Sequence, residues 1–327
     1  DGASVSGSVD GGTGADTLDL SASTSGVTVD LLSGSATSVG AISSIENLLT
    51  GAGDDTIIGA LSATILDTGA GNDTLDFSAV TADLAITVHA SGAISISDGT
   101  DTVSNVSGVE NIVGGSGTNT YIFEDGASLA GTIAGGSNVL NYAASSTAIT
   151  VNIGAGTATG TGGVSNVVSV IGGSGSDTLT GPAADASWSI TSANSGSVGG
   201  VSFTGIENLA GGSGSDSFVF ADSASVTGAV TGGAGSDTLD HSASTAGITI
   251  DLSSGTATGT GGIADIESVV TGAGNDTIIG ALSATILGTG DGNDTLDFSA
   301  VTAGLAITVH ASGAVSISDG TSSVSNV

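Results

Sequence analysis

The sequence predicts an all-β fold, a parallel β-solenoid with about 20 residues per coil and no helices. Three observations predict it: 57 glycines among 327 residues, short segments in which apolar and polar residues alternate, and a glycine-rich six-residue pattern that recurs along the chain. Only 3% of the residues are aromatic, whereas small β-forming residues are abundant. Such side chains fill a narrow, stacked core better than a wide globular one.

The strands are expected between the glycine-rich segments. In ASTSGVTVDLLSG, the apolar residues Val27, Val29 and Leu31 alternate with polar neighbours, and AITVHASGAISISDG shows the same pattern. Alternation over four to six residues, bounded by Gly, Ser, Asp and Asn, is typical of strands joined by turns.

A long internal repeat organises the chain. Residues 1–106 align without a gap to residues 222–327, and 79 of these 106 positions are identical. The sequence therefore predicts one continuous solenoid, with a first 221-residue unit at 1–221 (about 11 coils) and the first half of a second copy at 222–327. A chain that begins and stops within copies of a repeat is expected to be a piece of a longer array.

The charge balance excludes several classes of function. The chain has no Lys or Arg and 32 acidic residues. Without cationic side chains it cannot neutralise phosphates, so nucleic acid is excluded as a partner, and so are anionic membrane surfaces. No stretch approaches the length of a membrane span, so membrane insertion is not expected. The carboxylates cannot form salt bridges with Lys or Arg, and calcium is the usual cation for oxygen-rich sites outside the cell.

The shorter repeat is a six-residue segment of the type GGxGxD, here called a hexad. Hexads occur at 11–16, 50–55, 68–73, 114–119, 172–177, 211–216, 232–237, 271–276 and 289–294, and a degenerate copy starts at Gly135. Several of them continue with Thr-Leu. This pattern resembles the repeats-in-toxin (RTX) family of secreted bacterial proteins. The layout of isolated hexads separated by strands resembles the repetitive regions of giant bacterial surface proteins and adhesins.

The resemblance implies calcium ligands at the last position of the hexads. In the family, carbonyl groups and an Asp from one coil face those of the next coil, and calcium sits between them. The matching residues are Asp16, Asp55, Asp73, Asp177, Asp216, Asp237, Asp276 and Asp294. RTX repeats normally follow one another every nine residues, whereas these are isolated. Complete sites are therefore expected only where hexads occupy adjacent coils.

Three aspartate pairs have that spacing: Asp55 with Asp73, Asp216 with Asp237, and Asp276 with Asp294. A fourth pair of hexads offers only Asn119 and Asn138. The alternative interpretation is that the hexads merely form turns, in which the Asp bonds its own backbone.

A second signature, Ile-Glu-Asn or a close variant, ends shortly before four of the hexads and contains Glu46, Glu110, Glu207 and Glu267. These carboxylates could join a calcium site from the neighbouring turn. We favour the other interpretation, a hydrogen-bonding step stacked between coils. The segment before Gly172 reads Val-Val-Ser and has no carboxylate at all.

No catalytic constellation is predicted, so the chain is not expected to be an enzyme. His89 and His310 occupy the same repeat position and are interpreted as strand residues, while His241 replaces Leu20 of the first copy. Serines are abundant but show no recurring base partner. The single tryptophan, Trp188, is interpreted as a strand residue, with contact to surface glycans as the alternative.

The sequence therefore predicts an extracellular structural element of a secreted or cell-surface bacterial protein. Its expected partners are identical copies, which would build a fibre, sheath or surface-layer filament by head-to-tail stacking, with calcium as the stabilising cofactor. The alternative is the rigid spacer of a giant type I-secreted adhesin.

Overall fold

The computed structural model describes residues 4–59, 61, 65–280, 282, 285–311 and 314–324. In these residues every regular element is a strand, and the predicted all-β class without helices is confirmed there. No helix in the described part of the chain could cross a membrane. The chain divides into two compact units, Asp1–Ile149 with Gly156–Gly175, and Thr150–Ala155 with Ser176–Val327. The predicted repeat boundary at residue 221 falls inside the second unit.

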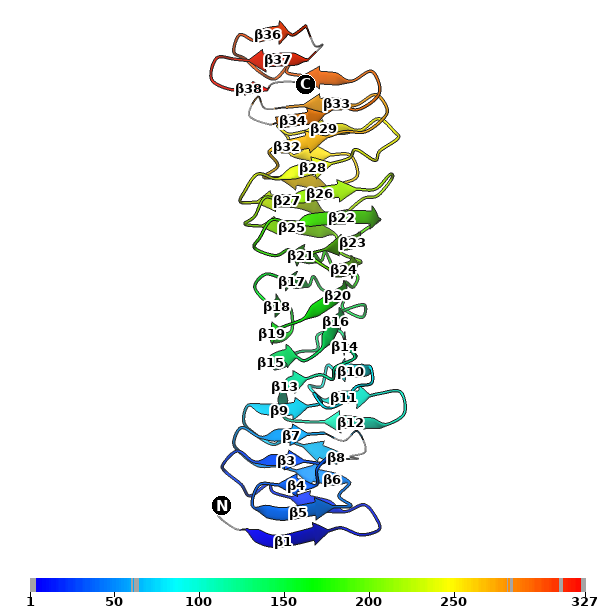
Figure 1. Ribbon diagram of the computed structural model, residues 1–327, viewed down its shortest axis with the longest axis vertical. Helices are drawn as coiled ribbons and strands as arrows, with labels where there is room; N and C mark the ends of the chain where they lie inside the picture. Colours follow the sequence, from blue (N-terminus) through cyan, green and yellow to red (C-terminus); the bar gives the residue numbers. More distant parts are fainter. Residues whose placement is uncertain are drawn as a thin grey trace. The chain divides into compact units, whose positions relative to one another are not determined.

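Strands of the first unit pair in three groups (Figure 1). One group contains β1 (Val5–Asp10), β5 (Val39–Ser43), β4 (Ser35–Ala36), β3 (Thr28–Asp30), β7 (Thr56–Ile58), β9 (Asp73–Asp76), β13 (Val109–Val113), β15 (Leu129–Ala134) and β19 (Thr161–Val164), which follows β18 (Thr157–Ala158). The second group contains β2 (Thr17–Asp19), β6 (Asn47–Leu49) and β8 (Ile65–Asp67). The third contains β12 (Thr102–Val106), β11 (Ile94–Ser97), β10 (Leu84–Val88), β14 (Thr118–Phe123), β16 (Ser137–Asn141) and β20 (Val167–Ile171).

Strands of the second unit form four groups. The first contains β24 (Val201–Thr204), β23 (Ser195–Val198), β22 (Ser187–Ser192), β26 (Ser217–Phe220), β28 (Thr238–Asp240), β32 (Ser268–Val270) and β34 (Thr285–Gly288). The second contains β17 (Thr150–Asn152), β21 (Thr178–Thr180), β25 (Asn208–Gly212), β27 (Ala229–Gly233) and β31 (Gly262–Ala264). The third contains β30 (Thr256–Ala257), β29 (Thr249–Asp251), β33 (Thr277–Ile279) and β35 (Thr295–Asp297), and the fourth contains β36 (Ala306–Val309), β37 (Val315–Ser318) and β38 (Ser323–Val324).

Parallel pairing stacks equivalent apolar residues into columns. Val29, Ile57 and Leu75 are partners across β3, β7 and β9, and each is at most 1% exposed. In the second unit, Trp188 pairs with Phe218 across β22 and β26, and their rings stack with centroids 5.4 Å apart. Trp188 is fully buried, which confirms its interpretation as a strand residue. These columns place the alternating apolar residues in a narrow core.

The predicted spacing of about 20 residues holds only for part of the chain. Thr56 pairs with Thr74, a step of 18 residues, and Leu209 pairs with Val230, a step of 21. Leu84, however, pairs with Asn119, a step of 35. A uniform step near 20 residues is therefore wrong.

Inserted antiparallel strands explain the long steps. Between β10 and β14 the chain forms β11 and β12, which pair antiparallel in the order β10, β11, β12. The strands β22, β23 and β24 repeat this arrangement in the second unit. The sheets that contain these insertions are consequently mixed. Period-2 alternation predicts strands but does not distinguish a parallel neighbour from an antiparallel one.

Candidate metal centre

The hexad at 68–73 is a tight turn that requires glycine at two positions. Gly69 and Gly71 have φ values of 85° and 155°, which side-chain-bearing residues rarely adopt. A Cβ on Gly71 would also collide with the carbonyl of Gly53 in the preceding hexad. Conformation and close stacking together explain the glycines, and they bring the carbonyl groups of successive hexads close to one another.

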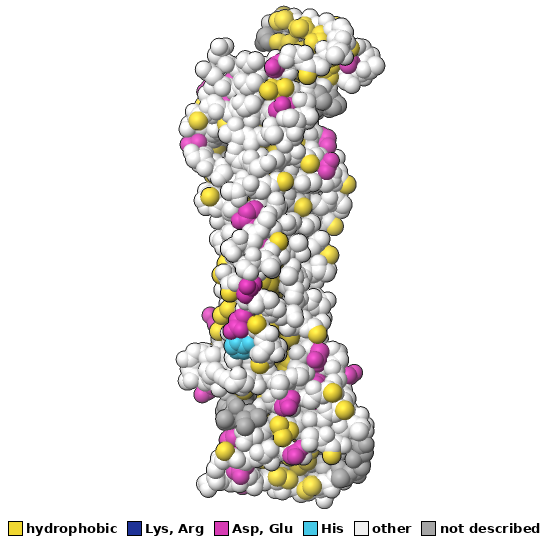
Figure 2. All heavy atoms as spheres, turned by 180° about the vertical axis from the view of Figure 1, so that it is seen from behind, with side chains coloured by type: hydrophobic (Ala, Val, Ile, Leu, Met, Phe, Trp, Pro, Cys, Tyr) yellow, Lys and Arg dark blue, Asp and Glu magenta, His cyan; other side chains and the backbone are white. Residues whose placement is uncertain are grey.

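The aspartates that end the hexads point into the protein. Six of the eight are at most 1% exposed, and the list is Asp55, Asp73, Asp177, Asp216, Asp237 and Asp276. Asp16 and Asp294 are half-buried. Figure 2 shows other acidic side chains spread over the visible face of a chain without Lys or Arg. Buried carboxylates need partners other than salt bridges to such residues.

One oxygen of the aspartate bonds the backbone of the preceding layer. Oδ1 of Asp55 accepts a hydrogen bond from the N–H of Val27 at 2.8 Å, and Oδ1 of Asp276 accepts one from Ile248 at 2.9 Å. Oδ1 of Asp216 accepts from Ala186 in the same way at 2.9 Å. At these hexads the Asp thus joins two layers, instead of bonding only its own turn as the alternative interpretation supposed.

The structure brings together the three aspartate pairs expected from the spacing. The backbone N–H of Asp55 donates to Oδ1 of Asp73 at 2.8 Å. The corresponding bonds run from Asp216 to Asp237 at 2.7 Å and from Asp276 to Asp294 at 3.0 Å. In the fourth pair, Nδ2 of Asn119 donates to Oδ1 of Asn138 at 3.2 Å. Asp16 and Asp177 belong to hexads that have no neighbouring hexad at this spacing.

Where no adjacent hexad follows, a glutamate takes over the same role. Oε2 of Glu110 accepts the N–H of Asp73 at 2.8 Å. The same bond joins Asp16 to Glu46 (2.9 Å), Asp177 to Glu207 (2.9 Å) and Asp237 to Glu267 (2.8 Å). The prediction of a hydrogen-bonding step between coils is confirmed. The glutamate of this signature substitutes for the missing aspartate of the next hexad.

The other aspartate oxygen is left without a partner. Oδ2 is buried and unbonded in Asp16, Asp55, Asp73, Asp216, Asp237 and Asp276. At the hexads that carry Asn, the corresponding amides are satisfied: Nδ2 of Asn138 donates to the carbonyl of Ser165 at 2.7 Å. A carboxylate has no hydrogen for this purpose. Its free oxygen therefore needs either a proton or a cation.

The free oxygens lie beside backbone oxygens. A Cβ on Gly211 would collide with both Oδ2 of Asp216 and the carbonyl of Gly232. A Cβ on Gly232 would likewise meet Oδ2 of Asp237 and the carbonyl of Asp265. Carboxylate and carbonyl oxygens are the ligands that calcium prefers, so this donor set fits calcium. The described residues contain no group of three or more Asp, Glu, His or Cys that could hold a metal, so other oxygens, such as these backbone carbonyls, would have to supply part of any site.

Burial makes the negative charge on these aspartates unfavourable. Desolvation raises the pKa of Asp73, and the neighbouring carboxylates of Asp55 and Glu110 add to this effect. Burial also raises the pKa of Asp216 and of Asp237, with further contributions from Asp237 and Glu267, respectively. A positive charge beside these carboxylates would act in the opposite direction and lower their pKa values.

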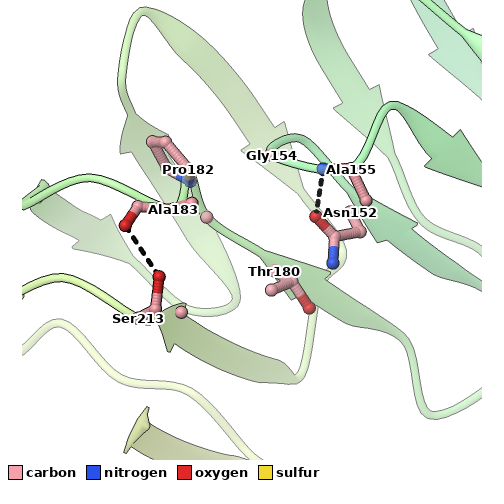
Figure 3. A pocket seen from close by; sticks show the side chains of 9 residues that line it. Asn152, Gly154, Ala155, Thr180, Pro182, Ala183 and Ser213 are labelled. Carbon is pink, nitrogen blue, oxygen red and sulfur yellow. Dashed lines mark hydrogen bonds between the residues drawn. The ribbon is translucent and has the colours of Figure 1, made fainter. Parts of the chain in front are cut away.

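A surface cavity of about 350 Å³ in the second unit has a different character (Figure 3). Asn152 and Ala155 lie on one side, where Oδ1 of Asn152 accepts the N–H of Ala155 at 2.8 Å, and Ser213 donates to the carbonyl of Ala183 at 2.9 Å on the other. None of the residues that line it is titratable. It offers no general acid or base.

Comparison with known families agrees with the hexad geometry. Segments 43–76, 169–182 and 261–296 match the RTX calcium-binding nonapeptide repeat, in four copies. The chain carries RTX repeats. The match confirms the resemblance inferred from the hexads and identifies calcium as the ligand of the motif. No curated protein matches the chain.

The RTX segments include five of the eight aspartates, namely Asp55, Asp73, Asp177, Asp276 and Asp294. Asp16, Asp216 and Asp237 lie outside them, although Asp216 and Asp237 have the same burial, the same bond and the same free Oδ2 as the pair Asp55 and Asp73 inside. The assignment of individual aspartates as calcium ligands stays a prediction. RTX repeats are structural and calcium-binding rather than catalytic, and proteins that contain them are typically secreted by bacteria.

Proposed function

We propose that this chain is an extracellular structural element of a secreted bacterial protein, a β-solenoid whose layers are stabilised by calcium. The observation that carries the proposal is the set of six hexad aspartates that each have one buried, unbonded oxygen, in a chain that has no Lys or Arg. A cation would satisfy these oxygens and remove the repulsion between neighbouring carboxylates. The family match supports calcium as that cation.

The aspartate pairs are the best candidates to hold calcium. Asp55 with Asp73, Asp216 with Asp237, and Asp276 with Asp294 would contribute carboxylate oxygens, and the hexad carbonyls would contribute the rest. Calcium would supply positive charge between layers and would thereby couple folding to the calcium concentration outside the cell.

Calcium removal tests this function directly. The purified chain is melted in calcium and in excess chelator, with far-ultraviolet circular dichroism as the readout. We expect calcium to raise Tm by an amount that depends on its concentration, because a ligand that binds only the folded state stabilises it by RT ln(1 + [L]/Kd). Magnesium at the same concentration is the control. Identical melts in calcium, magnesium and chelator would contradict a structural role for calcium.

We further propose that identical copies associate end to end as a fibre. Support comes from the parallel ladders, in which Ile86 and Val88 of β10 lie opposite Tyr121 and Phe123 of β14, and all four side chains are buried. A parallel strand presents a hydrogen-bonding edge to the next strand, and a second copy is the occupant that a fibre requires.

The alternative role, a rigid spacer in an adhesin, requires no such association. Sedimentation velocity in calcium distinguishes the two. Assemblies that grow with protein concentration support the fibre, whereas a chain that stays monomeric at all concentrations supports the spacer.

A further inference from the structure

Three side chains of the first unit form a hydrogen-bonded relay at the protein surface. Nε2 of His89 lies 2.8 Å from Oγ of Ser95, and Nδ1 of the same ring lies 2.8 Å from Oε1 of Glu124. The second oxygen of Glu124 accepts the N–H of Ala90 at 3.0 Å, which orients the carboxylate. A hydroxyl, an imidazole and a carboxylate in this order are the arrangement by which proteins activate a serine.

The strand register explains why these residues meet. Thr87 pairs with Ser95 in the antiparallel ladder of β10 and β11, so His89, two residues further along on the same face, lies diagonally beside Ser95. Val88 also pairs with Phe123 in the parallel ladder of β10 and β14, and this places Glu124 beside His89. Ser95 lies within β11, whereas His89 and Glu124 directly follow β10 and β14, so the interpretation of His89 as a strand residue is off by one position.

The carboxylate determines which ring nitrogen carries the hydrogen. The N–H of Ala90 and the bond from His89 lower the pKa of Glu124, so this group is ionised and can only accept. Nδ1 of His89 is then the donor, and Nε2 presents its lone pair to the hydroxyl of Ser95. His89 is thus oriented to take the proton of Ser95. The sequence-based statement that no serine has a recurring base partner is wrong.

We propose that Ser95 is an activated nucleophile that accepts an acyl group from small activated esters. Oγ attacks the ester carbonyl while its proton moves to Nε2 of His89. The bond between the carbonyl carbon and the leaving oxygen then breaks, and the leaving group takes the proton from His89. The products are an ester on Ser95 and a free alcohol or phenol. No further reactant is required.

The surroundings define the class of acyl donor. The side chains of His89 and Glu124 are 27% and 46% exposed, so a donor can approach from solvent. The net charge of −32 repels anionic donors and favours neutral or cationic ones. Glu124 acts as a positioning residue, because it contacts only the imidazole and the backbone.

The internal repeat supplies a matched control within the same chain. Nε2 of His310 lies 2.8 Å from Oγ of Ser316, which are the counterparts of His89 and Ser95 in the second copy. Among the described residues, no carboxylate bonds Nδ1 of His310. If the relay activates the serine, Ser95 reacts faster than Ser316, whereas an unassisted hydroxyl would react equally at both places.

The test uses neutral p-nitrophenyl acetate and the intact chain in calcium. Background acylation is low because the chain has no Lys and no Cys, and its two tyrosines are buried. We expect a stoichiometric burst of p-nitrophenolate and, in peptides from a protease that cleaves at acidic residues, about tenfold or more acetyl on Ser95 relative to Ser316. Ser95→Ala should abolish the label at this site.

Two variants separate activation from a structural role. His89→Asn and Glu124→Gln should each lower labelling of Ser95 about tenfold or more, while labelling of Ser316 and the Tm stay unchanged. Equal labelling of Ser95 and Ser316, or a Glu124→Gln chain that labels like the parent, would overturn the proposal. The readout does not depend on calcium binding, so its failure leaves the proposed structural function intact.

Discussion

Asp73 donates its backbone N–H to Oε2 of Glu110 at 2.8 Å, across 37 positions of sequence. In the same layer, Oδ1 of Asp73 accepts the N–H of Asp55 at 2.8 Å. A line of backbone-to-carboxylate bonds thus runs through successive layers and ends on a glutamate where the hexads end. The two sequence signatures, GGxGxD and Ile-Glu-Asn, therefore belong to one hydrogen-bond network that provides acceptors for buried backbone N–H groups.

Removal of the Glu110 carboxylate should measure how much this hydrogen bond stabilises the fold. Glu110→Ala leaves the N–H of Asp73 without its acceptor and should lower the free energy of unfolding by about 1–3 kcal/mol. Glu110→Gln keeps an acceptor oxygen and should recover most of the loss. Urea denaturation measures both. Equal destabilisation by Ala and Gln would show that the charge of Glu110, and not its hydrogen bond, matters.

Substitution of Asp237 by Asn should separate hydrogen bonding from calcium binding. The amide supplies a hydrogen where Oδ2 of Asp237 is unbonded, as Asn138 does at its own hexad. We expect Asp237→Asn to melt higher than the parent in chelator and to show a smaller calcium-induced rise in Tm. Asp101→Asn, at an exposed turn, is the matched control and should change neither value. A variant that melts lower in chelator and keeps the full calcium response would show that Asp237 is not a ligand.

Part of this architecture could be predicted from sequence. Alternation identified strands such as β10, and hexad spacing identified the pairs Asp55–Asp73 and Asp216–Asp237, because adjacent layers bring equal positions of a repeat together. The antiparallel insertions were not predicted, since AITVHASGAISISDG alternates in the same way whichever neighbour its strands have.

The relay at Ser95 was missed for a related reason. Glu124 lies 35 positions beyond His89, and only the parallel register of β10 and β14 brings the two together. The available signal was the six-residue spacing of His89 and Ser95, which recurs at His310 and Ser316. In an antiparallel pair of strands, such a spacing can place two outward-facing residues side by side.

The stability of the calcium-free chain should fall as pH rises from mildly acidic to neutral. Burial raises the pKa of Asp73, Asp216 and Asp237, so the folded chain binds more protons than the unfolded chain between the unfolded pKa, near 3.8, and the raised folded values. Stability decreases with pH wherever the folded state holds more protons. Melts in chelator across this interval should show the decrease, and saturating calcium should remove it.

A decrease of stability at still lower pH has another origin. Hydrogen bonds from Ser253 and Ser254 lower the pKa of the partly exposed Asp251 to about 2. Such a group stabilises the fold above its unfolded pKa and loses this contribution as pH falls toward 2, although solvent screening keeps the effect small. The calcium-free chain should therefore be most stable at mildly acidic pH. A monotonic rise of Tm from acid to neutral pH in chelator would contradict the protonation of the buried aspartates.

Because the hexads stack closely, substitution of Gly71 should destabilise the fold more than substitution of other glycines with positive φ. Gly71→Ala combines an unfavourable φ of 155° with a collision against the carbonyl of Gly53, and we expect a loss of about 3 kcal/mol or more. Gly126 has a φ of 74° and open space around its Cα, so Gly126→Ala should cost only about 1–2 kcal/mol. Urea denaturation measures both, and equal losses would show that conformation alone requires the hexad glycine.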